Sequence, residues 1–312
     1  MDTPVSQTGS PLLSILCITY NHARYIAKAL DAFLAQQTNF AIEIVLADDC
    51  STDETLDIVE GYRDQAGDRL HVLTSPINQG ITRNFRRALR ACRGKYVAIC
   101  EGDDYWRGST KLQTQVDYLE RHLDCVITFH NATIVDDDGE HDVPQLPPQL
   151  RCDASAAELI ATRPISTLTT CFRNVLDSLP PEFDQAPALD ICLWSLLGHQ
   201  GYGKYLAEIE PAAYRMHSGG VFSLQSERNR HLMTAQSLLC LARVYARQDQ
   251  HAQSNALLLK ANQMARVPLG LSANLRLFGF SLKHIIYVGI QRALPRPRPD
   301  YVRRRRRGGG QM

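Results

Sequence analysis

The sequence predicts an α/β fold with a mainly parallel sheet and flanking helices, followed by a helical extension. In residues 1–130, short apolar runs alternate with segments whose apolar residues recur at helical spacing. The connections are short, and repeated β-α units of this length build a parallel sheet covered on both faces. The chain has 312 residues, of which 44% are hydrophobic and 21% charged, as is typical of a globular protein.

The amino-terminal part predicts five strands and four helices. The strands are expected at 12–19, 42–47, 70–75, 95–100 and 125–130. The helices are expected at 22–37, within 48–64, at 82–92 and at 109–122. For the second helix we expect Ser51 or Thr52 as the N-cap, with Asp53 and Glu54 in the first turn.

The rest of the chain predicts fewer strands. Residues 131–165 carry DDDGEHD and VPQLPPQL, which indicate an irregular, exposed loop. We expect a strand at 166–172, a helix at 188–201 that begins near Asp190 and ends at Gly201, and two helices within 232–267. The expected organisation is a disordered 1–10, an α/β domain at 11–223, a helical extension at 224–294 and a basic disordered tail at 295–312.

Composition excludes several classes of protein. The nine cysteines are odd in number and form no CxxC pair, so we expect reduced, mostly buried thiols of a cytosolic protein. No apolar stretch precedes Pro11, and no run reaches about 18 apolar residues, so we expect neither a signal peptide nor a spanning helix. The net charge of +1 gives no indication of nucleic-acid binding.

Polar residues follow three of the expected strands, at Thr19–Asn21, Asp48–Asp49 and Glu101–Asp104. Ligands of parallel sheets bind beyond the carboxyl ends of the strands, so these segments should meet at one rim. Crowded carboxylates raise one another's pKa, and a divalent cation such as Mg²⁺ or Mn²⁺ relieves that cost. A solvated Asp-Gly turn explains a lone GDD equally well, but the convergence at one rim favours a metal site.

Five segments, ordered and spaced over roughly residues 11–223, carry a family resemblance. They are SILCITYNHARYIAKALDAFLAQ, IEIVLADDCSTDETLDIV, NQGITRNFRRAL, GKYVAICEGDDYWRGSTKLQTQVDYL and YRMHSGGVFS. Together they resemble family 2 glycosyltransferases of the GT-A fold. The resemblance implies a nucleotide-sugar donor, a divalent metal and inversion at the anomeric carbon.

The resemblance also implies roles for individual residues at the donor site. It assigns Thr19, Tyr20 and Asn21 to the nucleobase, Asp49 to a uracil-type N–H, Arg83 to the nucleotide, Asp103 to the ribose and Asp104 to the metal. Helix capping remains an alternative for Asp49, and a solvated helix face for Arg83. Because GDD departs from a strict D-x-D, the choice of metal ligand rests on analogy, and Glu101 is left without a role.

Two further residues are implied outside the strand ends. Asp190 aligns with the base that deprotonates the acceptor, and a helix N-terminus would keep its pKa low. Its position alone favours an N-cap; the resemblance favours the base. The resemblance gives His217 as a metal ligand, against a purely structural histidine. For Trp106 we expect packing beneath the site, with stacking on an acceptor sugar as the alternative.

The favoured function is an inverting transferase that moves a sugar, preferably from a UDP-sugar, to a glycan or lipid-linked acceptor of a bacterial-type surface glycan. A sugar-nucleotide pyrophosphorylase is the first alternative, but it requires an early Gly-rich phosphate loop, for which GSPLLS is a poor candidate. An inactive nucleotide- or glycan-binding module is the second. The joint presence of Asp49, Asp103, Asp104 and Asp190 argues against that module.

The carboxyl-terminal segment leaves two interpretations open. Residues 271–294 can form an amphipathic helix with Arg276 and Lys283 on one face, and seven arginines follow between Arg296 and Arg307. Such a segment is attracted to an anionic membrane, which would make the protein cytoplasmic and peripheral on the inner face. A packed terminal helix with a solvated tail is the equal alternative. RNA binding is not expected, because no aromatic platform accompanies the arginines.

Overall fold

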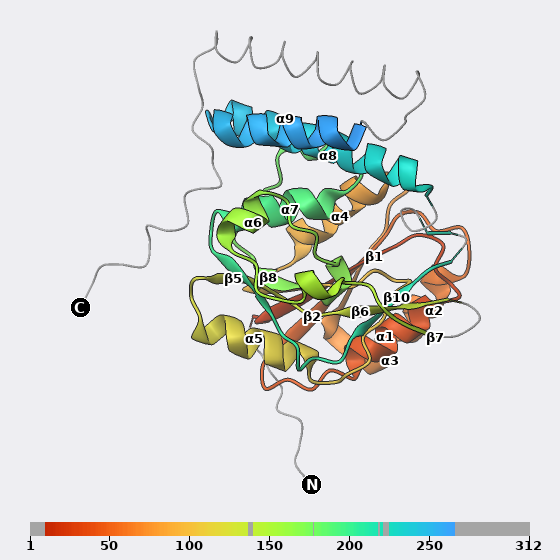
Figure 1. The fold of residues 1–312 in the computed structure, drawn as a ribbon. Helices are drawn as coiled ribbons and strands as arrows, with labels where there is room; N and C mark the ends of the chain where they lie inside the picture. Colours follow the sequence, from red (N-terminus) through yellow and green to blue (C-terminus); the bar gives the residue numbers. More distant parts are fainter. Residues whose placement is uncertain (1–9, 137–139, 177, 218, 221–224, 266–312) are drawn as a thin grey trace. The chain divides into compact units, whose positions relative to one another are not determined.

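The structure is a computed structural model, and it describes residues 10–136, 140–176, 178–217, 219–220 and 225–265 (Figure 1). The chain divides into two compact units. The first comprises Met1–Ala156, Ile165–Asn174 and Gln200–Met216, and the second Ala157–Pro164, Val175–His199 and His217–Met312. Residues 1–9 of the segment 1–10 that was expected to be disordered, the helix expected at 271–294 and the tail at 295–312 lie outside the described residues.

A seven-stranded sheet forms the centre of the first unit, in the order β3-β2-β1-β4-β8-β5-β9. The strands are β1 (Leu13–Thr19), β2 (Ile42–Asp48), β3 (Leu70–Leu73), β4 (Tyr96–Ile99), β5 (Cys125–Phe129), β8 (Cys171–Arg173) and β9 (Tyr202–Tyr205). β8 runs antiparallel to both of its neighbours, and the other pairs are parallel. The predicted mainly parallel sheet is therefore confirmed.

Helices cover both faces of this sheet, which explains why every residue of β1 and β2 is buried. They are α1 (Ile26–Leu34), α2 (Thr55–Gly61), α3 (Arg63–Ala66), α4 (Ile81–Ala91) and α5 (Lys111–Arg121), with a 3-10 turn at Gly67–Arg69. α1 and α5 lie on one face and α4 on the other (Figure 1). Phe33 of α1 and Trp106 belong to the main core, with ring centroids 5.1 Å apart.

A second, three-stranded sheet contradicts the expected irregular loop at 131–165. It consists of β6 (Ala132–Val135), β7 (Glu140–Pro144) and β10 (Ala212–Arg215). β6 pairs with β7 and with the distant β10, a long-range pairing that a local pattern does not reveal. The expected strand at 166–172 is also partly wrong, because a 3-10 turn at Thr167–Thr169 precedes the short β8; another lies at Pro148–Leu150.

The second unit is helical. It contains α6 (Ala156–Ile160), the 3-10 turn η4 (Pro181–Gln185), α7 (Leu189–Gly198), α8 (Glu227–Arg247) and α9 (His251–Ala265). The predicted pair of helices is confirmed as α8 and α9, and the Ser254 hydroxyl donates to the Ala242 carbonyl at 2.9 Å between them. Ser226 caps α8 by accepting from the Asn229 amide. Within the described residues, none of the helices has the length and apolar character needed to cross a membrane.

Three predicted helix boundaries are wrong for identifiable reasons. α1 starts at Ile26 rather than residue 22, because a loop precedes it. α2 starts at Thr55 behind Glu54, which makes no side-chain cap, so neither Ser51 nor Thr52 is the N-cap. α7 ends at Gly198. Gly201 instead permits close packing, since a Cβ there would lie 2.0 Å from the Asp124 carbonyl oxygen.

Candidate active site

The structure brings together the three polar segments predicted at the strand ends. Thr19 at the end of β1 pairs with Asp48 at the end of β2. The Asp49 amide donates to the Thr19 carbonyl at 2.9 Å, and the Gly102 amide donates to the Ile18 carbonyl at 3.0 Å. Residues 101–105, which we call the carboxylate tract, therefore run beside the last residues of β1, and the predicted rim exists.

The loop after β1 is held by the loop after β2. Asn21 has a φ of 55°, a conformation that asparagine tolerates better than most residues. Its amide donates to the Ser51 hydroxyl at 2.9 Å, and its side-chain oxygen accepts from the Thr52 amide at 2.7 Å. The His22 amide donates to the Thr55 hydroxyl at 2.8 Å. Ser51 and Thr52 thus fix the backbone around His22 instead of capping a helix.

Asp48 and Asp49 stabilise the loops next to the rim by accepting hydrogen bonds. Asp48 accepts from the Ser51 hydroxyl and amide, at 2.5 and 2.9 Å. The buried carboxylate of Asp49 accepts from the amides of Gln79 and Gly80, both at 2.8 Å. Gly80 has a φ of 83°, which requires glycine, and it directly precedes α4. Asp49 therefore holds the turn before α4, and its contact with a nucleobase stays a prediction.

Asp104 points away from solvent and is only 4% exposed. Its Oδ1 accepts from the Arg215 amide at 2.7 Å. Burial raises the pKa of this carboxyl well above its usual range, the charges of Asp103 and Glu101 raise it further, and the hydrogen bond from Arg215 partly offsets them. Asp104 thus joins the tract to β10.

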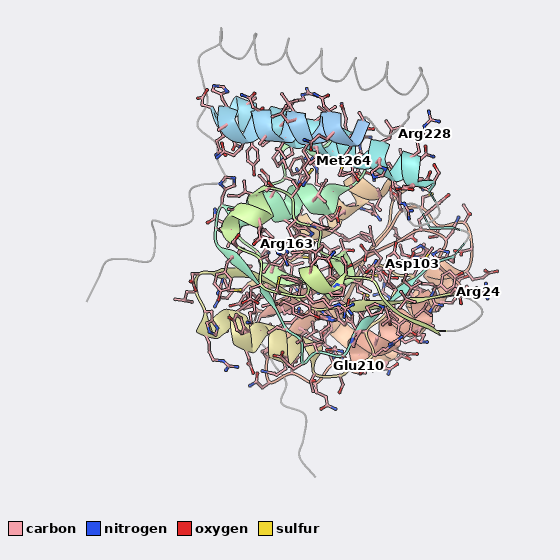
Figure 2. All side chains as sticks on the ribbon, viewed as in Figure 1. Arg24, Asp103, Arg163, Glu210, Arg228 and Met264 are labelled. Carbon is pink, nitrogen blue, oxygen red and sulfur yellow. The ribbon has the colours of Figure 1, made fainter. Side chains whose placement is uncertain are left out.

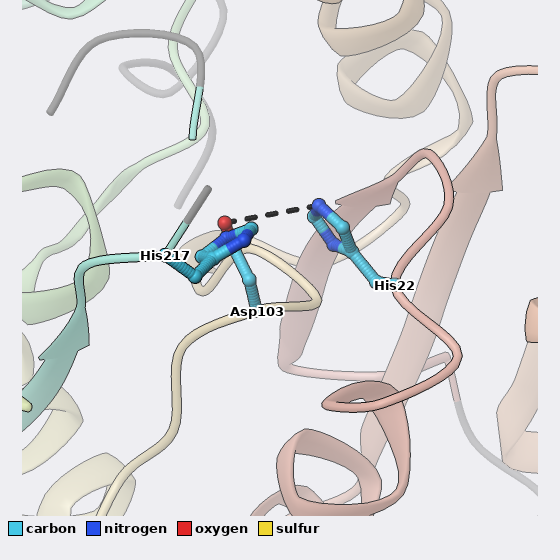
Figure 3. A group of neighbouring side chains, drawn as sticks. All are labelled: His22, Asp103 and His217. Carbon is cyan, nitrogen blue, oxygen red and sulfur yellow. Dashed lines mark ion pairs between the residues drawn. The ribbon is translucent and has the colours of Figure 1, made fainter. Parts of the chain in front are cut away.

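Asp103 instead faces two histidines (Figure 3). Its Oδ2 lies 3.7 Å from Nε2 of His22, and its side chain is 19% exposed. One ligand atom each from His22, Asp103 and His217 all lie within 4.8 Å of one another. The place of Asp103 among all the described side chains is labelled in Figure 2. His217 follows directly after Met216, whose amide donates to the Val135 carbonyl at 2.7 Å.

This cluster has the chemistry of a cation site. A carboxylate oxygen and two imidazole nitrogens form a donor set that suits a divalent transition metal such as Mn²⁺. Asp103 and His217 were expected near the metal or the donor, whereas His22 was missed. The signal for His22 was its place directly after the rim residues Thr19–Asn21.

Three other predicted residues have different surroundings. Tyr20 is 43% exposed, and Arg83 is an exposed residue of α4. Their proposed contacts with a nucleotide stay predictions. Trp106 is buried, and its Nε1 donates to the Leu168 carbonyl at 2.7 Å, so the packing interpretation is confirmed for this side chain.

Asp190 lies in the first turn of α7, in the second unit. Ala188 is the N-cap residue, so the N-cap interpretation of Asp190 is wrong. The expected low pKa is wrong as well. Burial raises the pKa of Asp190 to about 6, and hydrogen bonds from the amides of Ile191 and Asp190 lower it only in part.

The predicted state of the cysteines is confirmed. All nine cysteines are free thiols and most of them are buried.

Comparison with known proteins adds sequence relatives. An uncharacterized protein of Mycobacterium tuberculosis (strain ATCC 25618 / H37Rv) is 36% identical over 213 residues, covering 67% of this chain and 60% of the relative. The chain therefore spans about 60% of the length of that relative. The Escherichia coli UDP-Glc:alpha-D-GlcNAc-diphosphoundecaprenol beta-1,3-glucosyltransferase WfaP is 26% identical over 217 residues, covering 67% of this chain and 79% of the relative.

Solved structures confirm the fold. Residues 1–349 of Staphylococcus aureus TarS in complex with UDP-GlcNAc match with a TM-score of 0.65 and 20% identity, over 88% of this chain and 81% of that one. The mannosyltransferase PcManGT from Pyrobaculum calidifontis, in complex with GDP-Man and Mn²⁺, matches with a TM-score of 0.52 and 17% identity, over 91% and 85%. The predicted GT-A fold is thus confirmed.

The sequence resemblance is confirmed by a family model. The model described as Glycosyl transferase family 2 matches residues 14–173, which include the whole rim from Thr19 to Asp104. The chain belongs to glycosyl transferase family 2.

Proposed function

We propose that the protein is a metal-dependent, inverting glycosyltransferase that moves a sugar from a nucleotide-diphosphate donor to a glycan or lipid-linked acceptor. The observation that carries the proposal is the cluster of His22, Asp103 and His217, close to the rim where β1, β2 and β4 end. Family membership supports the transferase class and argues against a sugar-nucleotide pyrophosphorylase. It also weighs against an inactive binding module.

The donor set favours Mn²⁺ over Mg²⁺, because Mg²⁺ prefers an all-oxygen octahedron whereas Mn²⁺ accepts imidazole nitrogen more readily. When bound, such an ion would offset the negative charge that develops on the leaving diphosphate. The family resemblance implied Asp104 as the metal ligand. The contacts favour Asp103 for this role, because Asp104 is buried against the Arg215 amide whereas Asp103 faces the histidines.

A UDP-sugar is the preferred donor. The nucleobase of the donor is expected beside Thr19, Tyr20 and Asn21, on the loop held by Ser51 and Thr52. A relative in Escherichia coli is named as a transferase that uses UDP-Glc. Direct contacts of Asp49 and Arg83 with the nucleotide are part of the same proposal.

Asp190 is proposed as the base that takes the proton from the acceptor hydroxyl. A pKa of about 6 leaves this carboxyl mostly ionised at pH 7, yet more basic than an ordinary aspartate. Loss of that proton makes the acceptor oxygen the nucleophile at the anomeric carbon, and the bond to the diphosphate breaks on the opposite side. The raised pKa supports this role better than the low value expected from the sequence.

The names of relatives suggest the class of acceptor. One is a putative teichuronic acid biosynthesis glycosyltransferase of Bacillus subtilis, 32% identical over 129 residues, and another acts on a diphosphoundecaprenol-linked sugar. A surface glycan or its lipid-linked precursor is therefore the proposed acceptor. The basic tail at 295–312 would then hold the protein at the anionic inner face of the membrane.

Paired substitutions test the metal site. Asp103→Asn should weaken Mn²⁺ binding in the presence of UDP about 100-fold, since it removes the ligand carboxylate. Asp104→Asn keeps an oxygen that can accept from the Arg215 amide, so its Mn²⁺ affinity should stay within about threefold of the wild type. Electron paramagnetic resonance of free Mn²⁺ measures both.

Three outcomes are informative. If Asp104→Asn weakened Mn²⁺ binding more than Asp103→Asn does, Asp104 would be the metal ligand instead of Asp103. A wild-type protein that binds neither Mn²⁺ nor any member of a panel of UDP- and GDP-sugars, measured by thermal protection, would reject the proposed function. Formation of a glycosidic product with inverted configuration, followed by nuclear magnetic resonance, would support it.

A further inference from the structure

Strand β10 is joined to the carboxylate tract by backbone and side-chain contacts together. Tyr105 and Ala213 exchange amide-to-carbonyl hydrogen bonds of 3.3 and 2.9 Å. One residue earlier in the tract, the Asp104 carboxylate accepts from the Arg215 amide at 2.7 Å. The segment 213–215 therefore runs antiparallel along 103–105 and fixes its course.

The side chain of Arg215 extends this contact to Asp103. Its Nε donates to the main-chain carbonyl of Asp103 at 2.9 Å. Its guanidinium carbon lies 4.7 Å from the ring centroid of Tyr25 and 5.6 Å from that of Tyr105. The guanidinium is thus held by two aromatic rings while its Nε–H is directed at the peptide that carries the Asp103 carboxylate.

We propose that Arg215 is a positioning residue, which fixes the backbone of Asp103 so that its carboxylate faces His22. This inference rests on the proposed function, because it concerns the metal site described there. Arg215 acts through the peptide group of Asp103 and has no part in binding the cation itself. Since β10 leads directly through Met216 to His217, the same strand sets the point from which the chain reaches His217.

Electrostatics and positioning predict opposite effects for the loss of Arg215, which makes the inference testable. A cation near the site repels a divalent metal, so removing its charge alone should tighten Mn²⁺ binding. Removing the hydrogen bond to Asp103 should instead weaken binding, because the carboxylate is no longer held in place. The sign of the change in Mn²⁺ affinity therefore separates the two effects.

Arg215→Met is the test variant, since it keeps an apolar side chain of similar length between the rings but removes the donor and the charge. Lys28→Met is the matched control. Nζ of Lys28 lies 3.8 Å from the ring centroid of Tyr105, so this change removes the same charge from the same ring. Among the residues that the structure describes, the Lys28 side chain makes no hydrogen bond to residues 101–105.

Binding of Mn²⁺ in the presence of UDP is measured by electron paramagnetic resonance on the full chain, with the midpoint of thermal unfolding as a check of folding. Arg215→Met should weaken Mn²⁺ binding about tenfold, which is the size of effect that groups supporting a ligand have. Lys28→Met should leave it unchanged or tighten it. Arg215→Lys restores a donor and a charge, and should recover part of the affinity.

In a transfer assay, the Mn²⁺ concentration for half-maximal rate should rise for Arg215→Met while the rate at saturating Mn²⁺ stays near that of the wild type. Equal or tighter Mn²⁺ binding by Arg215→Met would overturn the inference and leave the proposed function standing. Failure of the wild type to bind Mn²⁺ with UDP would overturn both. If Arg215→Met does not fold, Arg215→Lys decides. It lacks the Nε–H that donates to the Asp103 carbonyl and should bind Mn²⁺ more weakly than the wild type, so unchanged affinity would overturn the inference.

Discussion

Two carboxylates, Asp53 in the loop after β2 of the first unit and Asp190 in α7 of the second unit, have pKa values shifted in opposite directions. At the rim, Asp53 accepts from the amides of Ala23 and Thr55 and from the Thr55 hydroxyl. Partial burial alone would raise the pKa of Asp53, but these hydrogen bonds outweigh it and the pKa is lowered. In α7 of the second unit, burial dominates and raises the pKa of Asp190 to about 6.

This difference separates a carboxylate that is suited to structural support from one that is suited to the proposed role of general base. A carboxylate that accepts several backbone hydrogen bonds is stabilised as an anion and is a weaker base, so Asp53 is suited to hold a loop. Asp49 also has a structural contact, since it accepts from the amides of Gln79 and Gly80 in the turn before α4. Asp190 keeps a higher affinity for a proton, as a general base requires.

The largest test of this comparison is Asp190→Asn. The amide cannot take a proton from the acceptor, so the transfer rate at saturating substrates should fall about 10³-fold. Binding of UDP with Mn²⁺ should stay unchanged, because Asp190 is not among the clustered ligands. Initial-rate kinetics and calorimetry measure the two quantities.

The pH dependence provides the accompanying check. Because the base must be deprotonated, the wild-type rate should rise with pH and level off above a pH of about 6. Asp190→Asn should lack this rise. A variant that keeps more than a tenth of the wild-type rate would remove Asp190 from the chemistry and end the contrast between the two units.

Within the first unit, the sequence predicted the seven-stranded sheet better than the three-stranded sheet. Apolar runs such as 13–19 and 42–48 identify buried strands because both faces of a covered sheet demand apolar residues. β6 and β7 were missed because their partner β10 is distant in the chain, and long-range pairing leaves no local signal. The convergence of strand ends at one rim followed from topology alone.

Individual site roles were harder to predict, since they depend on side-chain direction. Asp103 and Asp104 are neighbours in sequence, yet one faces histidines and the other is buried on the Arg215 amide. The packing of residues 213–215 against the tract determines that Asp104 is buried and that Asp103 faces the histidines. That contact joins segments more than 100 residues apart. The pKa of Asp190 was misjudged for a similar reason, because burial depends on tertiary packing.

A smaller effect is expected from Gly102→Ala at the rim. A Cβ there would lie 2.8 Å from Cδ1 of Ile26, 3.0 Å from Oγ1 of Thr19 and 3.1 Å from Nδ1 of His22. His22 must shift to make room, so Mn²⁺ binding should weaken about tenfold, comparable to the loss of a group that orients a ligand. Electron paramagnetic resonance of free Mn²⁺ in the presence of UDP measures the change in Mn²⁺ affinity.

Gly61→Ala is the matched control, because a Cβ there meets nothing within 4 Å and the residue lies in α2. It should leave Mn²⁺ binding unchanged and stabilise the fold slightly, by about 0.5 kcal/mol. Unaltered Mn²⁺ affinity in Gly102→Ala would mean that His22 is not required at the metal site, and would reduce the cluster to Asp103 and His217.

The smallest effect is expected from Tyr245→Phe in the second unit, where polar groups serve packing. The buried Tyr245 hydroxyl lies 2.7 Å from the Ser195 hydroxyl and 3.0 Å from Nε2 of His199. Its loss leaves these groups with one partner fewer, so the free energy of unfolding should fall by about 1 kcal/mol while Mn²⁺ affinity stays unchanged.

Tyr118→Phe is the matched control, since its hydroxyl meets that of Tyr202 at 3.0 Å in a part-buried pair that water can replace at little cost. Urea titration measures both variants. An equal loss in the two would show that burial does not set the worth of these hydroxyl contacts, and a change in Mn²⁺ affinity for Tyr245→Phe would show that the helices of the second unit take part in the metal site.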